Sequence, residues 1–151
     1  MRPFPMWRPC TFCRIIQGEA SAHVVYEDDR VLAFLDIHPS APGHTLIIPK
    51  AHVARVEDLS EEDASALFKA LHRLVGRIQD AVDAPSSTIG VNNGPESGQE
   101  VPHVHIHVIP RFRGDLGGII QGIARSRRRP SREETHRIAE RIRELSAADT
   151  F

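Results

Sequence analysis

The feature of this sequence that points most directly to chemistry is a row of alternating histidines in VPHVHIHVIP (101–110). A β-strand places alternate side chains on one face, so His103, His105 and His107 are predicted to share a face. The valines and isoleucine between them would face the other way and pack on a helix. Because imidazole titrates near neutral pH, binds metals and attacks electrophiles, the row indicates a chemical site. The alternative is a solvated strand face without a function.

The three histidines are not expected to bind one metal ion together. On a straight strand, neighbouring histidines lie ~6.6 Å apart and the outer pair ~13 Å apart, whereas zinc–nitrogen bonds are only ~2.0–2.1 Å long. We therefore expect the row to divide its roles, so that some imidazoles react while others position a ligand or bind a metal.

A second chemical motif is the pair Cys10 and Cys13, the chain's two cysteines. Their CxxC spacing is typical of a zinc knuckle, and because structural zinc takes four ligands, histidines would have to complete the set. One alternative is a thioredoxin-like redox pair, which would need a βαβ setting that the sequence lacks; the other is a pair of buried thiols. Zinc is preferred because suitable histidines are present.

Composition limits the class of protein. A length of 151 residues predicts one domain, and 26% charged and 40% hydrophobic residues are ordinary globular values. The net charge of −1 argues against a dedicated nucleic-acid-binding domain, which would be strongly basic. No apolar run reaches the ~20 residues that span a membrane, and the N-terminus does not resemble a signal peptide, so we expect a cytoplasmic protein.

Two helices are predicted with caps. Apolar residues at spacings of three and four predict a long helix over 61–82, which Ser60 would cap. Ser131 and Glu134 would cap a last helix that ends at about Leu145. A short helical turn is expected within 12–18.

Five strands are predicted from alternating or β-branched residues, over 24–29, 31–37, 44–49, 87–92 and 101–110. Strands outnumber helices, and no regular strand–helix–strand alternation occurs. This pattern favours an α+β domain with an antiparallel sheet.

Together these motifs resemble the histidine triad (HIT) superfamily. HVHIHVI matches its His-x-His-x-His signature, and VYEDD, LAFLDI, GHTLIIPKAH and VNNGPESGQ occur in the order seen in bacterial members. The similarity covers about residues 10–113. It implies a HIT-like fold in a single domain (1–151) that forms a homodimer, with a CxxC arm over 1–13 and an arginine-rich segment and C-terminal helix over about 125–151.

The resemblance also implies an activity, that of a nucleotide hydrolase that forms a covalent nucleotidyl-histidine at the α-phosphate. His105 matches the nucleophile, His107 the histidine that hydrogen-bonds phosphate oxygens, and His44 the fourth histidine near the leaving group. Substrates of this class are nucleoside phosphoramidates, acyl-adenylates and dinucleoside polyphosphates, which release a nucleoside monophosphate. Two alternatives are a nucleotidyltransferase or phosphorylase of the same superfamily, and a regulatory module that binds nucleotide with little turnover.

A pocket for a purine nucleotide or nucleotide conjugate is implied as well. Asp36 matches the acceptor of the ribose hydroxyls, and Phe34 and Ile37 would line the base. The phosphate would be held by Asn92, Gln99 and the backbone amides of the turn from Gly98 to Val101. Glu100 stands where many HIT hydrolases have a small hydroxyl residue, and a carboxylate there repels phosphate unless it turns outward or is protonated. This departure supports the regulatory alternative.

Zinc-containing bacterial members suggest how the cysteine pair is completed. The ligands implied by the resemblance are Cys10, Cys13, His52 and His103, in a structural site that ties the N-terminal arm to the histidine strand. The run RSRRRPSR (125–132) is interpreted as a solvated tail rather than a phosphate-binding patch. The other four histidines, which match no motif, are expected in loops and on the surface: His23, His38, His72 and His136.

Overall fold

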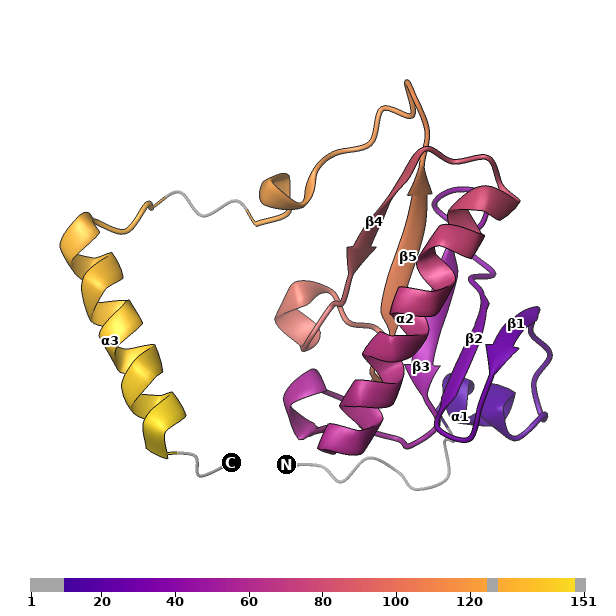
Figure 1. The fold of residues 1–151 in the computed structure, drawn as a ribbon, viewed down its shortest axis with the longest axis horizontal. Coiled ribbons are helices and arrows are strands. Elements are labelled where there is room, and N and C mark those ends of the chain that lie inside the picture. The colour runs from indigo at the N-terminus through magenta and orange to yellow at the C-terminus, as the bar shows by residue number, and fades with distance from the viewer. Residues whose placement is uncertain (1–9, 125–127, 149–151) are drawn as a thin grey trace. The chain divides into compact units, whose positions relative to one another are not determined.

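The computed structural model describes residues 10–124 and 128–148, which contain three α-helices and five strands (Figure 1). The predicted arm over 1–13 and the arginine-rich segment over 125–132 lie partly outside the described residues. In chain order the elements are α1 (Thr11–Ile16), β1 (Val24–Glu27), β2 (Val31–Leu35), β3 (Thr45–Pro49), α2 (Glu61–Ala81), β4 (Ser86–Gly90), β5 (Ile106–Arg111) and α3 (Arg132–Ala148). Among these residues no helix is both long and apolar enough to cross a membrane.

The sheet is antiparallel throughout, with the strand order β1-β2-β3-β5-β4, which confirms the predicted α+β class. The first strand is shorter than predicted because a side chain closes the turn that follows it. Asp28 accepts the backbone N–H groups of Arg30 and Val31, so the chain leaves β1 after Glu27. The end of β2 at Leu35 leaves Asp36 and Ile37 in the following loop.

Both faces of the sheet are buried, each by a different helix (Figure 1). Helix α2 packs on one face, where Val104, Ile106 and Val108 are buried, as the alternating pattern predicted. Its start at Ser60 is also confirmed, because that side chain accepts the N–H of Asp63. On the other face, Phe12 of α1 packs with residues of β2 and β3: Leu32, Phe34, Leu46 and Ile48. Burial by two helices explains the continuous apolar runs of β2 and β3.

The histidine strand begins later than predicted, at Ile106 instead of residue 101. Its partner β3 pairs with it from Thr45 to Ile47 and ends at Pro49, which has no N–H to donate. The segment 101–105 therefore runs beyond the ladder, although its alternation of side chains continues.

The contacts divide the chain into two units, 1–117 and 118–151. In the second unit, α3 begins with the predicted capping box, since Ser131 and Glu134 each accept the other's backbone N–H. The helix continues to Ala148, three residues past the predicted end. The single domain predicted over 1–151 stays a prediction.

Candidate functional site

The histidine row carries two clusters of reactive side chains. At one end Cys10, Cys13, His52 and His103 bring their ligand atoms together. Both cysteine sulfurs lie 3.6 Å from Nδ1 of His103. The Nδ1 atom of His52 lies 3.3 Å from Cys13 Sγ and 3.3 Å from His103 Nδ1. The four residues that the sequence predicted as metal ligands thus form one group.

Local structure directs the His103 ring toward the sulfurs. The carbonyl oxygen of Pro49 accepts the Nε2–H of His103 at 2.7 Å. The Nδ1 atom is then the nitrogen with a free lone pair, and it is the one that faces the cysteines. The cysteines are brought to it by α1, which Cys10 caps and which includes Cys13.

Electrostatics favour a cation at this cluster. Burial, reinforced by the neighbouring Cys10, raises the pKa of the Cys13 thiol to about 11. Burial also lowers the pKa of His103. The environment thus supplies no positive charge that would hold the thiolates, and a bound metal ion would supply it while releasing protons. The set of two thiols and two imidazoles is therefore compatible with a metal site.

In the middle of the row, His105 is buried, and its ring makes one hydrogen bond with a described residue. Its Nδ1 lies 2.7 Å from the carbonyl oxygen of His103, which can only accept, so the proton of the neutral ring is on Nδ1. The Nε2 atom keeps its lone pair, and no described residue hydrogen-bonds to it.

A second hydrogen-bonded chain fixes His44 and His107. The backbone N–H of Ser40 donates to Nδ1 of His44 at 3.0 Å, so the proton of this ring is on Nε2. That Nε2 lies 2.9 Å from Nδ1 of His107 and donates to it, which leaves the His107 proton on its own Nε2. The Asp36 carboxylate lies 3.6 Å from His44 Nε2 and supports this arrangement.

Both rings of this pair are neutral at pH 7. Burial lowers the pKa of His107 to about 4, helped by the neighbouring His105 and His44. Burial also lowers the pKa of His44, which the Asp36 carboxylate only partly offsets. His107 is therefore a hydrogen-bond donor through Nε2 and not a fixed positive charge.

The predicted nucleotide residues lie on two loops and on β2. Phe34 is buried in β2, whereas Ile37, just past its end, is 72% exposed. Asn92 follows β4, is half-buried and makes no side-chain hydrogen bond with another described residue. Gly98 adopts a φ of +96°, a left-handed conformation that favours glycine, in the turn that leads to half-buried Val101.

Gln99 differs from the sequence expectation in what its side chain contacts. Its Oε1 accepts the Gly94 N–H at 2.8 Å, and its Nε2 donates to the carbonyls of Ala54 and Val101. The amide therefore braces the loop in this structure. Its predicted phosphate contact stays a prediction.

One residue of the site was not predicted. Phe12, between the two cysteines, is only 7% exposed, and its ring lies 5.1 Å from that of His105 and 5.9 Å from that of His103. Its apolar side chain between metal-ligating residues was the only signal in the sequence. The four histidines predicted for loops and surface, His23, His38, His72 and His136, are all exposed, as expected.

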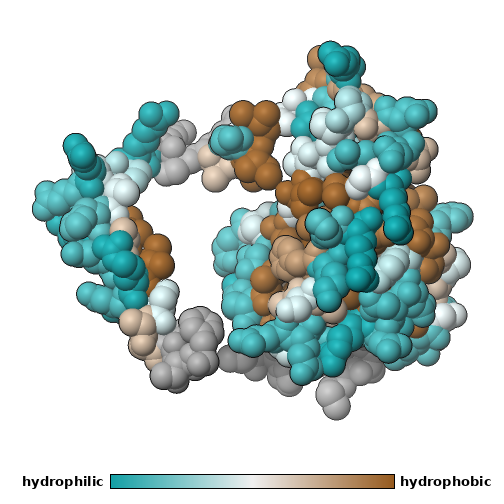
Figure 2. Space-filling view, viewed as in Figure 1, coloured by the Kyte–Doolittle hydropathy of each residue, from teal (hydrophilic) through white to brown (hydrophobic). Residues whose placement is uncertain are grey.

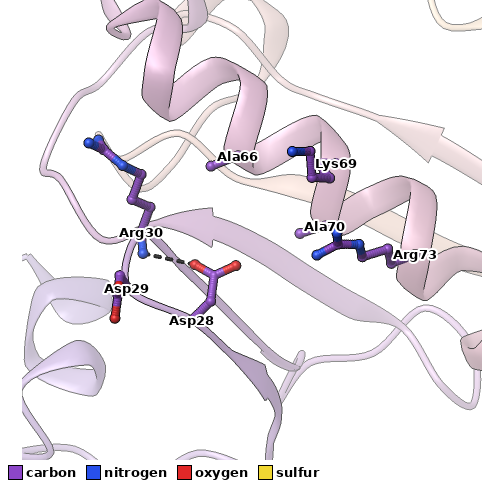
Figure 3. A pocket seen from close by; sticks show the side chains of 7 residues that line it. All are labelled: Asp28, Asp29, Arg30, Ala66, Lys69, Ala70 and Arg73. Carbon is purple, nitrogen blue, oxygen red and sulfur yellow. Dashed lines mark hydrogen bonds between the residues drawn. The ribbon is translucent and has the colours of Figure 1, made fainter.

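An open hollow of about 280 Å³ lies away from the histidines, between the β1–β2 turn and α2 (Figure 3). Two of its charged groups have partners within the protein: Arg30 pairs with Glu62 and Asp63, and Asp28 accepts the Arg30 backbone N–H that Figure 3 draws. None of the residues that line the hollow is a histidine or a cysteine, so the histidine row is the candidate site.

Comparison with known proteins agrees with this assignment. The HIT domain profile matches residues 17–114. A HIT-like protein of Methanocaldococcus jannaschii is 45% identical over 106 residues, 70% of this chain and 81% of that protein. Adenylylsulfatase HINT3 of Arabidopsis thaliana is 40% identical over 106 residues, 70% of this chain and 54% of that protein.

Solved structures share the fold. The SMU.412c protein of Streptococcus mutans has a TM-score of 0.80 at 36% identity, covering 90% of this chain and 84% of that one. A Zn-bound histidine triad family protein of Mycobacterium smegmatis has a TM-score of 0.67 at 34% identity, covering 93% of this chain and 97% of that one. A HIT family hydrolase of Legionella pneumophila has a TM-score of 0.58 at 41% identity, covering 67% of this chain and 91% of that one. Cys10 and Cys13 lie before the matched domain, so the metal cluster adds N-terminal residues to it.

Proposed function

The chain belongs to the histidine triad (HIT) family, and on that premise we propose that it is a nucleotide hydrolase acting at the α-phosphate. The observation that carries the proposal is the hydrogen bond from His105 Nδ1 to the His103 carbonyl, which leaves Nε2 as an unprotonated nucleophile. The similarity to an adenylylsulfatase and to a HIT family hydrolase supports it. The substrate class proposed is a purine nucleotide conjugate: a phosphoramidate, an acyl-adenylate or a dinucleoside polyphosphate.

In the first step the Nε2 lone pair of His105 attacks the α-phosphorus. The new N–P bond forms as the bond to the leaving group breaks, and the leaving group departs with its electron pair and takes a proton from solvent, while the Nε2–H of His107 donates a hydrogen bond to a phosphate oxygen. The Nδ1–H of His105 still donates to the His103 carbonyl and stabilises the positive charge on the ring. Water then attacks phosphorus and loses a proton to solvent, the N–P bond breaks with its electron pair returning to His105 Nε2, and a nucleoside monophosphate is released.

The neutral state of His107 suits this role. Because its depressed pKa keeps the ring uncharged at pH 7, His107 donates a hydrogen bond through Nε2 to a phosphate oxygen and keeps that proton throughout. His44 holds the ring of His107 in the tautomer that points this proton outward.

For the nucleotide we propose the arrangement that the resemblance implied. Asp36 would accept the ribose hydroxyls, with Phe34 and Ile37 at the base. Asn92 is assigned as a phosphate donor because its side-chain amide makes no hydrogen bond with another described residue. In the antiparallel pairing Gly90 lies opposite His107, so Asn92, two residues further along, is expected beside His105, which lies two residues before His107. The backbone amides from Gly98 to Val101 complete the phosphate site, with Gln99 bracing their loop.

We further propose that the metal at the cysteine cluster is zinc. A tetrahedral zinc site has edges of about 3.3–3.4 Å between two nitrogens and about 3.5–3.6 Å between sulfur and nitrogen. The distance between the His52 and His103 nitrogens is 3.3 Å, and each cysteine sulfur lies 3.6 Å from His103 Nδ1. When bound, zinc supplies a structural link between α1 and the histidine row.

The homodimer is proposed on the sheet edge. Strand β4 is the last strand of the sheet, its Ile89 is 37% exposed, and hydrophobic surface gathers between β4 and α2 (Figure 2). A second copy that extended the sheet at β4 would cover this surface. Light scattering of the purified chain distinguishes a dimer from a monomer.

One experiment tests the function. The chain is incubated with adenosine and guanosine phosphoramidates and dinucleoside polyphosphates, with and without added phosphate, and the products are identified. Release of a nucleoside monophosphate supports hydrolysis, whereas a nucleoside diphosphate that appears only with phosphate indicates transfer. Binding of nucleoside monophosphate without turnover of any substrate indicates the regulatory alternative. Glu100 is exposed, so its charge can be solvated, and this favours turnover over that alternative.

A further inference from the structure

Phe12 contacts three functional parts of the protein at once. Its ring meets those of His105, His103 and Phe34 edge to face, at centroid distances of 5.1, 5.9 and 5.5 Å. The interplanar angles of 81°, 75° and 66° are those that aromatic pairs prefer. Metal binding does not require these contacts, because a residue between the two cysteines can face solvent, as Thr11 does.

The ring of His105 needs such a contact to stay in place. Its one hydrogen bond, from Nδ1 to the carbonyl of His103, fixes one ring atom but allows the ring to rock about that bond. Two further rings pack edge to face with it, those of His107 and Phe12, at centroid distances of 4.9 and 5.1 Å. The contacts with these two rings determine the direction in which the reactive Nε2 of His105 points.

The position of Phe12 depends in turn on the metal cluster. Helix α1 has only six residues, too few to be stable by itself in water. It is held by the apolar cluster around Phe12 and by the grouping of Cys10 and Cys13 with two histidines from distant parts of the chain. Release of the cysteines would loosen the helix that carries Phe12.

We propose that Phe12 is a positioning residue that couples the metal cluster to the nucleophile. When the cysteines bind the metal, α1 holds the Phe12 ring against the ring of His105, so that His105 Nε2 stays directed at the nucleotide. The same ring also packs against Phe34, which is proposed to lie at the base. This inference rests on the proposed role of His105.

The test uses the full chain and two substitutions on α1. Phe12→Leu keeps an apolar side chain but removes the flat ring, whereas Ile16→Ala removes partly buried apolar atoms from the same cluster and leaves the ring contacts of His105 intact. We expect the single-turnover rate of nucleotidyl-enzyme formation to fall about 10- to 100-fold in Phe12→Leu, because small displacements of reacting groups have effects of that size. Ile16→Ala should melt at a lower temperature and keep the wild-type rate. Metal content should be unchanged in both.

A second readout is independent of activity. In the metal-loaded wild type, long-range ¹H–¹⁵N spectra of labelled histidine should show His105 as the single Nδ1–H tautomer. Both Phe12→Leu and removal of the metal by a chelator should replace it with mixed tautomers. Wild-type spectra in both cases, or a rate in Phe12→Leu equal to that of Ile16→Ala, would overturn the coupling. Wild-type turnover by His105→Asn would instead overturn the proposed function.

Discussion

His103 and His105, two residues apart, use the same side chain in opposite ways. At His103 the carbonyl of Pro49 accepts the Nε2–H and leaves Nδ1 facing the cysteines. At His105 the carbonyl of His103 accepts the Nδ1–H and leaves Nε2 without a hydrogen-bond partner among the described residues. Two backbone oxygens thus select opposite nitrogens. The roles of these two imidazoles therefore depend on which backbone carbonyl lies beside each ring.

The largest effect on turnover should come from removing the nucleophile while the cysteine–histidine cluster is left intact. His105→Asn removes the nucleophile, and we expect turnover to fall by about 10³-fold or more, as for other covalent catalysts. Product formation by chromatography gives the rate, and metal analysis should find the same metal content as in the wild type. His72→Asn, on an exposed face of α2, is the matched control and should leave both quantities unchanged.

Loss of the cysteine cluster should act directly on stability, and should reach the attacking Nε2 of His105 only indirectly, through α1. Cys13→Ser removes a proposed ligand, and the loss of a structural metal should lower the free energy of unfolding by on the order of 4 kcal/mol. Metal analysis and urea denaturation measure the two effects. Thr11→Ser, an exposed change between the same cysteines, should retain the metal. A Cys13→Ser protein with full zinc content and wild-type stability would contradict the site.

A smaller effect separates two neighbouring asparagines. Asn92→Ala should weaken binding of a nucleoside monophosphate about 10- to 100-fold, since a hydrogen bond to a charged group contributes about 1.5–3 kcal/mol. Asn93 instead accepts the Val56 N–H and donates to Glu57, so Asn93→Ala should lower stability by about 1 kcal/mol or less and leave affinity near that of the wild type. Calorimetric titration measures both affinities. Equal affinities in the two variants would remove Asn92 from the phosphate site.

The smallest effect is a pH dependence at the reactive end. In the unfolded chain His107 has a pKa near 6.5, whereas burial holds its folded pKa at about 4. Between these values the unfolded state binds more protons, so the wild type should lose stability as the pH falls from about 6.5 to about 4. His107→Gln should lose less over the same window. Urea denaturation at several pH values measures this difference, and parallel curves for the two proteins would contradict the depressed pKa.

The shared face of the histidine row followed from its alternation, and both ends of α2 lie within a residue of their prediction because caps and apolar spacing are local signals. The start of β5 did not follow, because it depends on where Pro49 ends the neighbouring strand. Which nitrogen of each histidine ring carries the proton also could not be predicted from the sequence. They are set by the Pro49 and His103 carbonyls and by the Ser40 N–H, backbone groups that only the folded chain brings to the rings.

Residues 101–105 run beyond the sheet ladder, and this has a consequence for how such proteins can diverge. A substitution there disturbs no strand pairing, because the hydrogen-bonded register begins only at Ile106. The other three members of the cysteine–histidine cluster, Cys10, Cys13 and His52, also lie outside the paired strands. A lineage could therefore acquire or lose this cluster through a few substitutions in unpaired segments, while the strand that carries His107 keeps its register.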